Sequence, residues 1–152
     1  MSIAEKLNEL GIVIPQAAKP LAAYIPAVKS GDLVYTSGQL PTQDGKLVWT
    51  GKVGDAITAE QGAEAARLCA LNCLAALNTV SSVENVVQIL KVTGFVNSAA
   101  GFTDQPTVMN GASELVKAIF GDSGVHARSA IGMAELPRNA SVEVEMIFRV
   151  RE

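Results

Sequence analysis

An arginine and a glutamate are the residues of this sequence best suited to anion binding and acid–base chemistry. Arg128 begins a run of small residues, and Glu143 lies in a later alternating run, so both side chains could enter one cleft if the two runs form neighbouring strands. A guanidinium binds a carboxylate through two parallel hydrogen bonds, which predicts a small carboxylate-bearing ligand. Spacing by itself favours another interpretation, in which Arg128 forms an internal salt bridge with Glu143 or Glu145.

Other reaction classes lack their sequence signatures. His126 is the only histidine, and no acidic cluster has a spacing suited to zinc or calcium, so no metal is expected. The sequence has neither a phosphate-binding glycine loop nor a Gly-x-Ser-x-Gly nucleophile elbow. Cys69 and Cys73 are four residues apart in a helical stretch, which indicates buried free thiols rather than a redox pair or a zinc site.

The hydrophobic pattern predicts the first elements that would position these residues. Apolar residues at helical spacing indicate a short amphipathic helix over 3–11, and several prolines then predict an irregular segment. A strand is expected at 32–37, where β-branched and aromatic residues gather. The turn dipeptide Asp44-Gly45 predicts a short hairpin partner at 46–50.

Two long helices and three strands are expected in the rest of the chain. The capping box Thr58-Ala59-Glu60-Gln61 begins a helix that continues to about Val80, and a second helix runs from about Pro106 to Gly121. The three strands span 86–97, 127–135 and 142–150. This order predicts an α+β fold, in which one mixed sheet carries both long helices on one face.

The other face of the sheet must meet solvent or another subunit. We expect the odd-numbered residues of 127–135 to point at the helices. The opposite face then carries Arg128, Ala130, Gly132, Ala134, Glu143, Glu145 and Ile147. Because small and apolar residues are frequent in this set, the chain is expected to form a homo-oligomer.

Composition narrows the class of protein. The 152 residues are 49% hydrophobic and 18% charged, which predicts one folded domain over 1–152, with a helix and extension at 1–16. A net charge of −3 makes nucleic acid an unlikely partner. No apolar run approaches the roughly 20 residues needed to cross a bilayer, and the start of the chain lacks a signal-peptide pattern, so a cytoplasmic protein without a membrane partner is expected.

Four segments occur in the order and spacing typical of one protein family. They are Tyr35-Thr36-Ser37-Gly38-Gln39-Leu40-Pro41, Ala127-Arg128-Ser129, Leu136-Pro137 and Val142-Glu143-Val144-Glu145. Over about residues 17–151 the chain resembles the Rid (reactive intermediate deaminase) or YjgF-like family. The resemblance implies a chorismate-mutase-like α+β fold, a homotrimer, and ligand clefts between subunits.

The resemblance also implies a reaction and the residues that perform it. Deaminating members hydrolyse reactive enamines and imines, such as 2-aminoacrylate, to 2-oxo acids and ammonia without a cofactor. Arg128 matches the arginine that binds the substrate carboxylate, and Glu143 matches the glutamate that positions or activates water. The positions that match cleft-lining residues are Tyr24, Ser37, Gly38, Asn110 and Ala130.

Three departures from the family pattern indicate a divergent subgroup. His126 stands where a proline commonly precedes Ala-Arg, and it is interpreted as a surface or structural residue rather than a proton shuttle. Ala130 replaces the cysteine or hydroxyl residue that helps to hold water in many active members. The third departure is additional length, since the N-terminal helix before Pro15 and residues 121–124 set this chain apart from the shortest members. A non-catalytic trimer that binds small carboxylates is therefore the alternative function, and an endoribonuclease is a weaker one.

Overall fold

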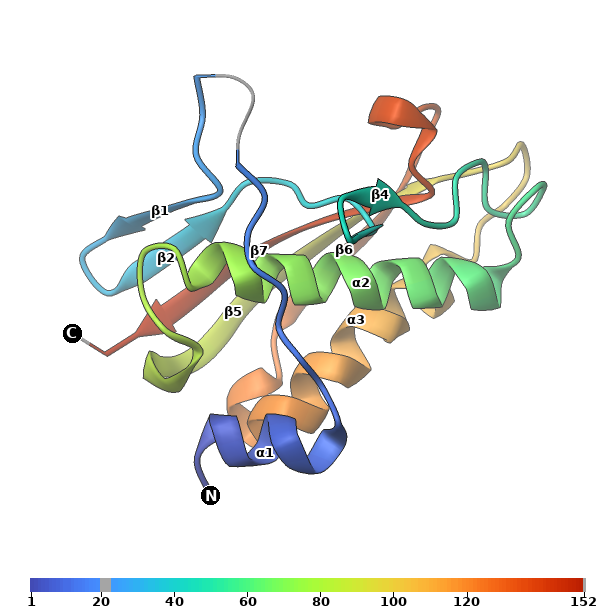
Figure 1. The fold of residues 1–152 in the computed structure, drawn as a ribbon. Helices are drawn as coiled ribbons and strands as arrows, with labels where there is room; N and C mark the ends of the chain where they lie inside the picture. The colour runs from blue at the N-terminus through green and yellow to red at the C-terminus, as the bar shows by residue number, and fades with distance from the viewer. Residues whose placement is uncertain (20–22, 152) are drawn as a thin grey trace.

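The computed structural model describes residues 1–19 and 23–151, and its main feature is a five-stranded mixed sheet (Figure 1). The predicted irregular segment therefore lies partly outside the described residues, at 20–22. The helices are α1 (Ile3–Leu10), α2 (Ala59–Leu77) and α3 (Gln105–Phe120), with short 3₁₀ turns at Val83–Asn85, Gly121–Gly124 and Pro137–Asn139. The strands are β1 (Ala27–Ser30), β2 (Leu33–Thr36), β3 (Thr42–Gln43), β4 (Lys46–Leu47), β5 (Val86–Asn97), β6 (Ala127–Met133) and β7 (Val142–Val150).

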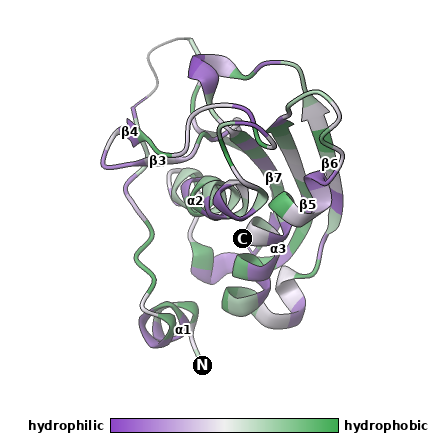
Figure 2. Cartoon of the chain, turned by 90° about the vertical axis from the view of Figure 1, so that its right-hand side faces the viewer, coloured by the Kyte–Doolittle hydropathy of each residue, from purple (hydrophilic) through white to green (hydrophobic). Residues whose placement is uncertain are grey.

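The strands of the main sheet are arranged in the order β1-β2-β7-β5-β6. Neighbouring strands are antiparallel except β5 and β6, which are parallel. A parallel pair requires a long crossover connection, and α3 supplies it here. Both long helices cover one face of the sheet (Figure 2), so the predicted α+β arrangement is confirmed.

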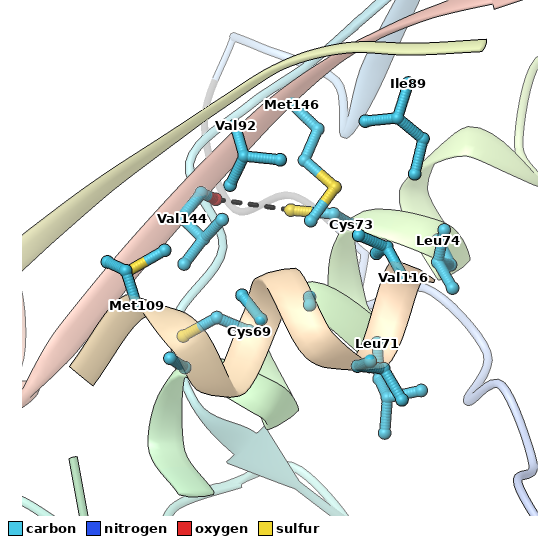
Figure 3. Close-up of a cluster of buried hydrophobic side chains, with 14 of the residues drawn as sticks. Cys69, Leu71, Cys73, Leu74, Ile89, Val92, Met109, Val116, Val144 and Met146 are labelled. Atoms are coloured by element: carbon cyan, nitrogen blue, oxygen red, sulfur yellow. Dashed lines mark hydrogen bonds between the residues drawn. The ribbon is translucent and has the colours of Figure 1, made fainter. Parts of the chain in front are cut away.

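The hydrophobic core lies between the sheet and these helices. Alternate residues of β7 are buried against the helices, as the period-two pattern of 142–150 predicts. The many alanines of α2 allow the helix to approach the sheet closely, and the buried Cys73 Sγ lies 3.3 Å from the Val144 carbonyl oxygen (Figure 3). Cys69 is also a buried free thiol, as expected.

Capping boxes in the sequence account for the starts of α2 and α1. Thr58 and Gln61 cap α2 reciprocally, at 3.1 and 3.0 Å, which confirms the predicted start. Ser2 and Glu5 do the same for α1, a signal that the pattern of 3–11 alone did not use. The Glu84 carboxylate accepts hydrogen bonds from the first amides of α1 and so attaches this helix to the body of the protein.

The edge of the sheet differs from the prediction. Strand β2 pairs with β1. The sequence pattern did not predict β1, because Pro26 immediately precedes this strand and only one large apolar residue, Val28, lies within it. The predicted strand at 46–50 reduces to the two residues of β4, which pair with β3 in a separate hairpin.

The predicted orientation of β6 is wrong by one residue. In the parallel register Arg128 is paired with Val92, and Ala130 with Gly94, both of which are buried on the helix side. Even-numbered residues of β6 therefore face the helices, and Ile131 points to the other face, where 42% of its surface is exposed. Small residues fit either face of a strand, so their spacing gave no signal for the correct choice.

Within residues 1–19 and 23–151, no helix is both long and apolar enough to cross a bilayer.

Candidate functional site

Strand β6 holds Arg128 against helix α3. Its Nη1 donates hydrogen bonds to Asn110 Oδ1 at 2.9 Å and to Ser113 Oγ at 3.2 Å. The two acceptors are three residues apart on α3, so they lie on the same helix face and contact one nitrogen together. Asn110, predicted from the resemblance, is therefore a neighbour of Arg128, whereas Ser113 was not predicted.

The partners of Arg128 are neutral. No carboxylate lies within ion-pair distance of its guanidinium among the described residues. Since Nη1 carries two hydrogens and both are used, the edge formed by Nε and Nη2 retains free donors. The internal salt bridge that spacing favoured is absent from this part of the chain.

Glu143 lies on the opposite face of the sheet from Arg128. It is paired with Phe95 of β5, and its neighbours Val142 and Val144 point to the buried helix side. Arg128 lies on β6, the other neighbour of β5, and its side chain faces α3. The expectation that the two side chains enter one cleft of the same protomer is therefore wrong. It depended on the incorrect orientation of β6 and on β6 and β7 being neighbouring strands, whereas β5 lies between them.

A pocket of about 390 Å³ surrounds Glu143, and its lining includes Tyr24 and Gly38. Gly38 leaves room for the carboxylate in its present position, because a Cβ here would lie 2.9 Å from both Cδ and Oε1 of Glu143. Three residues predicted from separate segments thus come together here. The full lining is Ala18, Lys19, Tyr24, Pro26, Gly38, Gln39, Leu40, Thr42, Pro137, Arg138 and Glu143.

Ser37 fastens one wall of this pocket. Its hydroxyl donates to the Ile25 carbonyl at 2.6 Å, and its amide donates to the Pro26 carbonyl at 2.7 Å. These bonds hold the segment that carries Tyr24 beside the end of β2. Ser37 was expected to line the cleft, but it is not among the residues that line this pocket; its hydrogen bonds instead attach the neighbouring segment.

The electrostatic environment of Glu143 favours its protonated form. Burial raises the pKa of this carboxyl group above its ordinary value, and the negative charge of Glu145 raises it further. No hydrogen bond to the Glu143 carboxylate is formed by the described residues. A pKa shifted in this direction lies nearer to neutral pH than that of an exposed glutamate, which suits proton exchange with a bound molecule.

Ala130 lies on the same face of β6 as Arg128 and packs against the core. Its methyl group offers no side-chain hydrogen bond, as the sequence implied.

Two further residues of the site were missed. Ser113 could have been found, because it follows Asn110 by one helical turn. Arg138 lines the Glu143 pocket with a left-handed backbone, at φ 58° and ψ 21°, and sequence gives little signal for that conformation in an arginine.

Metal-binding and thiol chemistry find no support in this geometry. Across the described ranges, no three side chains of His, Cys, Asp or Glu gather in a way that could hold a metal ion. Burial raises the pKa of Cys73 to about 12 and also raises the pKa of Cys69. Burial and the raised pKa values therefore both disfavour the reactive thiolate form.

Comparison with known proteins identifies relatives over nearly the whole chain. Residues 4–149 match the family described as "YjgF/chorismate_mutase-like, putative endoribonuclease". Protein TCP17 of Trypanosoma cruzi is 41% identical over 97% of this chain and 94% of its own. A 2-iminobutanoate/2-iminopropanoate deaminase of Dermatophagoides farinae is 33% identical over 90% of this chain and 92% of its own.

A solved structure shares the fold closely. The protein Atu1372 of Agrobacterium tumefaciens, of unknown function, is 42% identical, with a TM-score of 0.91 over 98% of this chain and 92% of its own.

Proposed function

Because this chain belongs to the YjgF/chorismate mutase-like family, to which the Rid deaminases belong, we propose that it hydrolyses reactive enamines and imines of small amino acids to 2-oxo acids and ammonia. The observation that carries the proposal is the Arg128 guanidinium, which has an unused pair of donors and no carboxylate partner among the described residues. The relative from Dermatophagoides farinae is named as a deaminase of 2-iminobutanoate and 2-iminopropanoate, which are imines of this kind.

Arg128 is suited to hold a substrate carboxylate in one orientation. Asn110 and Ser113 occupy Nη1, so the Nε and Nη2 edge is the part of the fork that can receive two carboxylate oxygens. Such a bidentate pair fixes both the position and the plane of the ligand. The substrate class that follows is a small molecule with a carboxylate next to its reactive carbon.

Arg128 and Glu143 would form one site by combining two protomers. They lie on opposite faces of the sheet in a single chain, so a composite site needs the Glu143 pocket of one protomer to face the Arg128 side of another. The face that carries Glu143 also exposes Val28, Tyr35 and Ile131, at 51%, 44% and 42%. An apolar surface of this kind is suited to a homotrimer with clefts between subunits.

The reaction requires positioning and proton transfer only. A proton from solvent adds to the methylene carbon of 2-aminoacrylate and gives the iminium ion, and water then adds to the iminium carbon to form a carbinolamine. Glu143 would accept a proton from the attacking water and deliver it to the nitrogen; the C–N bond then breaks, ammonia leaves, and the carbinolamine hydroxyl releases its proton to solvent as the C=O bond forms. The products are a 2-oxo acid and ammonia, and no step calls for a cofactor.

The activity can be tested with 2-aminoacrylate generated by a serine dehydratase. We expect the protein to accelerate pyruvate formation above the rate in buffer, and Arg128→Ala to lower kcat/KM by about 100-fold, because two charge-assisted hydrogen bonds are lost. Arg67→Ala is the matched control, since Arg67 is an exposed arginine of α2, in the helix layer on the other side of the sheet from Glu143. Equal acceleration by wild type and Arg128→Ala would refute the proposal.

A second function is favoured by one specific residue. Ala130 has no hydroxyl or thiol with which to hold water beside Arg128, which suits a trimer that binds small carboxylates without turnover. Calorimetry with pyruvate separates the two functions, because binding without deamination supports the second one. The net charge of −3 argues against RNA as a substrate, despite the name given to the family.

A further inference from the structure

We infer that Ser113 and His126 are positioning residues that orient the Arg128 guanidinium for its ligand, an inference that rests on the function proposed above. His126 Nε2 lies 2.9 Å from Ser113 Oγ, and Ser113 Oγ lies 3.2 Å from Arg128 Nη1. The other ring nitrogen of His126 lies 2.6 Å from the carbonyl oxygen of Gly124. A chain of hydrogen bonds thus extends from a fixed backbone group to the anion-binding arginine.

The donors in this chain can be assigned from its two ends. The Gly124 carbonyl can only accept, so His126 Nδ1 carries a hydrogen. In the neutral ring Nε2 is then an acceptor, and the Ser113 hydroxyl donates to it. The lone pairs of Ser113 Oγ remain available for the hydrogen of Arg128 Nη1, which can only donate.

The fixed end of the chain depends on a glycine. A Cβ on Gly124 would lie 2.3 Å from the Val116 carbonyl oxygen, so only glycine permits this close contact with the end of α3. The contact places the Gly124 carbonyl where His126 can reach it. The 3₁₀ turn Gly121–Gly124 therefore anchors the hydrogen-bond chain.

Two acceptors restrict Arg128 more than one acceptor would. With Asn110 alone, the guanidinium could rotate about a single hydrogen bond and turn its free edge away from the ligand. Ser113 occupies the second hydrogen of the same nitrogen and fixes the plane of the group. His126 in turn keeps the Ser113 hydroxyl hydrogen away from Arg128.

The functional test measures pyruvate affinity by calorimetry and the kinetics of 2-aminoacrylate hydrolysis. We expect Ser113→Ala to raise both Kd and KM about 10-fold, with a smaller change in kcat, because a hydrogen bond to a charged group is lost. Ser113→Thr retains the hydroxyl and should restore wild-type affinity. Thr107→Ala removes a hydroxyl of the same helix that donates to Asp104, the residue before α3, and should leave Kd unchanged.

A double-mutant cycle separates positioning from general damage. His126→Ala should weaken pyruvate binding in the wild-type background and have no further effect when Ser113 is already alanine. Additive losses would overturn the inference, since they would mean that His126 does not act through Ser113.

Nitrogen NMR of the imidazole tests the geometry without any ligand. The chain has one histidine, so its ring gives a single set of signals. The inference expects the hydrogen on Nδ1 at neutral charge, and a hydrogen on Nε2 instead would overturn it. If wild-type protein neither binds pyruvate nor hydrolyses 2-aminoacrylate, the proposed function fails, and the positioning role fails with it. If wild type binds and Ser113→Ala binds equally well, only this inference fails.

Discussion

Replacement of Gly38 by alanine perturbs the candidate acid–base residue, Glu143, without substituting it. The added Cβ would lie 2.9 Å from the Glu143 Cδ, whereas carbon atoms in contact are optimally about 3.5–4.0 Å apart. The carboxyl group must therefore retreat by about 0.6–1 Å. Gly38 does not have a positive φ, so alanine can adopt its backbone conformation and the effect is steric alone.

A displacement of this size is expected to reduce turnover more than stability. Misplacement of a catalytic group by about 1 Å can cost about 100-fold, so we expect Gly38→Ala to lower kcat for 2-aminoacrylate hydrolysis by about 10- to 100-fold. The free energy of unfolding should change by less than about 1 kcal/mol, because the displaced atoms are the end of a flexible side chain. Chemical denaturation measures the second quantity.

The double variant distinguishes this mechanism from obstruction of the cleft. In a Glu143→Ala background there is no carboxyl group to displace, so Gly38→Ala should cause no further loss of kcat. An equal loss in both backgrounds would refute the reasoning. A kcat equal to that of wild type for the single variant would refute it as well.

Three other predictions concern pH, thiols and packing. Burial raises the pKa of Glu143 in the folded state, so the stability of the wild-type protein falls as the pH rises from about 4.5 through that raised pKa. Glu143→Gln should therefore have a higher Tm than wild type at about pH 8 and the same Tm below about pH 4.5. A difference in Tm that stays constant with pH would contradict this. Cys69 and Cys73 should resist thiol reagents at about pH 8 until the protein is unfolded in guanidinium, so labelling of the folded protein would contradict their burial. Gly111→Ala should destabilise the protein by about 2 kcal/mol despite the better helix propensity of alanine, because its Cβ would lie 2.0 Å from a backbone oxygen of α2. Chemical denaturation tests this, with the exposed Lys117→Ala variant as control. Equal stabilities of Gly111→Ala and the control would contradict the prediction.

Sequence patterns predicted the elements whose signals are local. The capping box at Thr58 and the long apolar alternation of 142–150 gave the start of α2 and the bounds of β7 correctly, because each depends on neighbouring residues only. Strand β1 was missed because it is stabilised by pairing with β2, and its own four residues give no sequence signal for that pairing.

The members of the candidate site were predicted only in part, and their arrangement was not predicted. Tyr24, Gly38 and Glu143 were identified by family resemblance, and they share one pocket. The relation of Arg128 to Glu143 was wrong, since a strand of small residues fits either face and only contacts with α3 determine which side Arg128 takes. Contacts between protomers lie beyond what the pattern of one chain can specify.

The composite site can be tested by mixing two inactive variants. Arg128→Ala and Glu143→Gln proteins would be unfolded together in equal amounts, refolded, and assayed for 2-aminoacrylate hydrolysis, with mass spectrometry to verify mixed trimers. If each site combines Arg128 of one protomer with Glu143 of its neighbour, about one quarter of the sites contain both intact residues, so about one quarter of wild-type activity should return. Mixed trimers that stay as inactive as either parent would contradict a site shared between protomers.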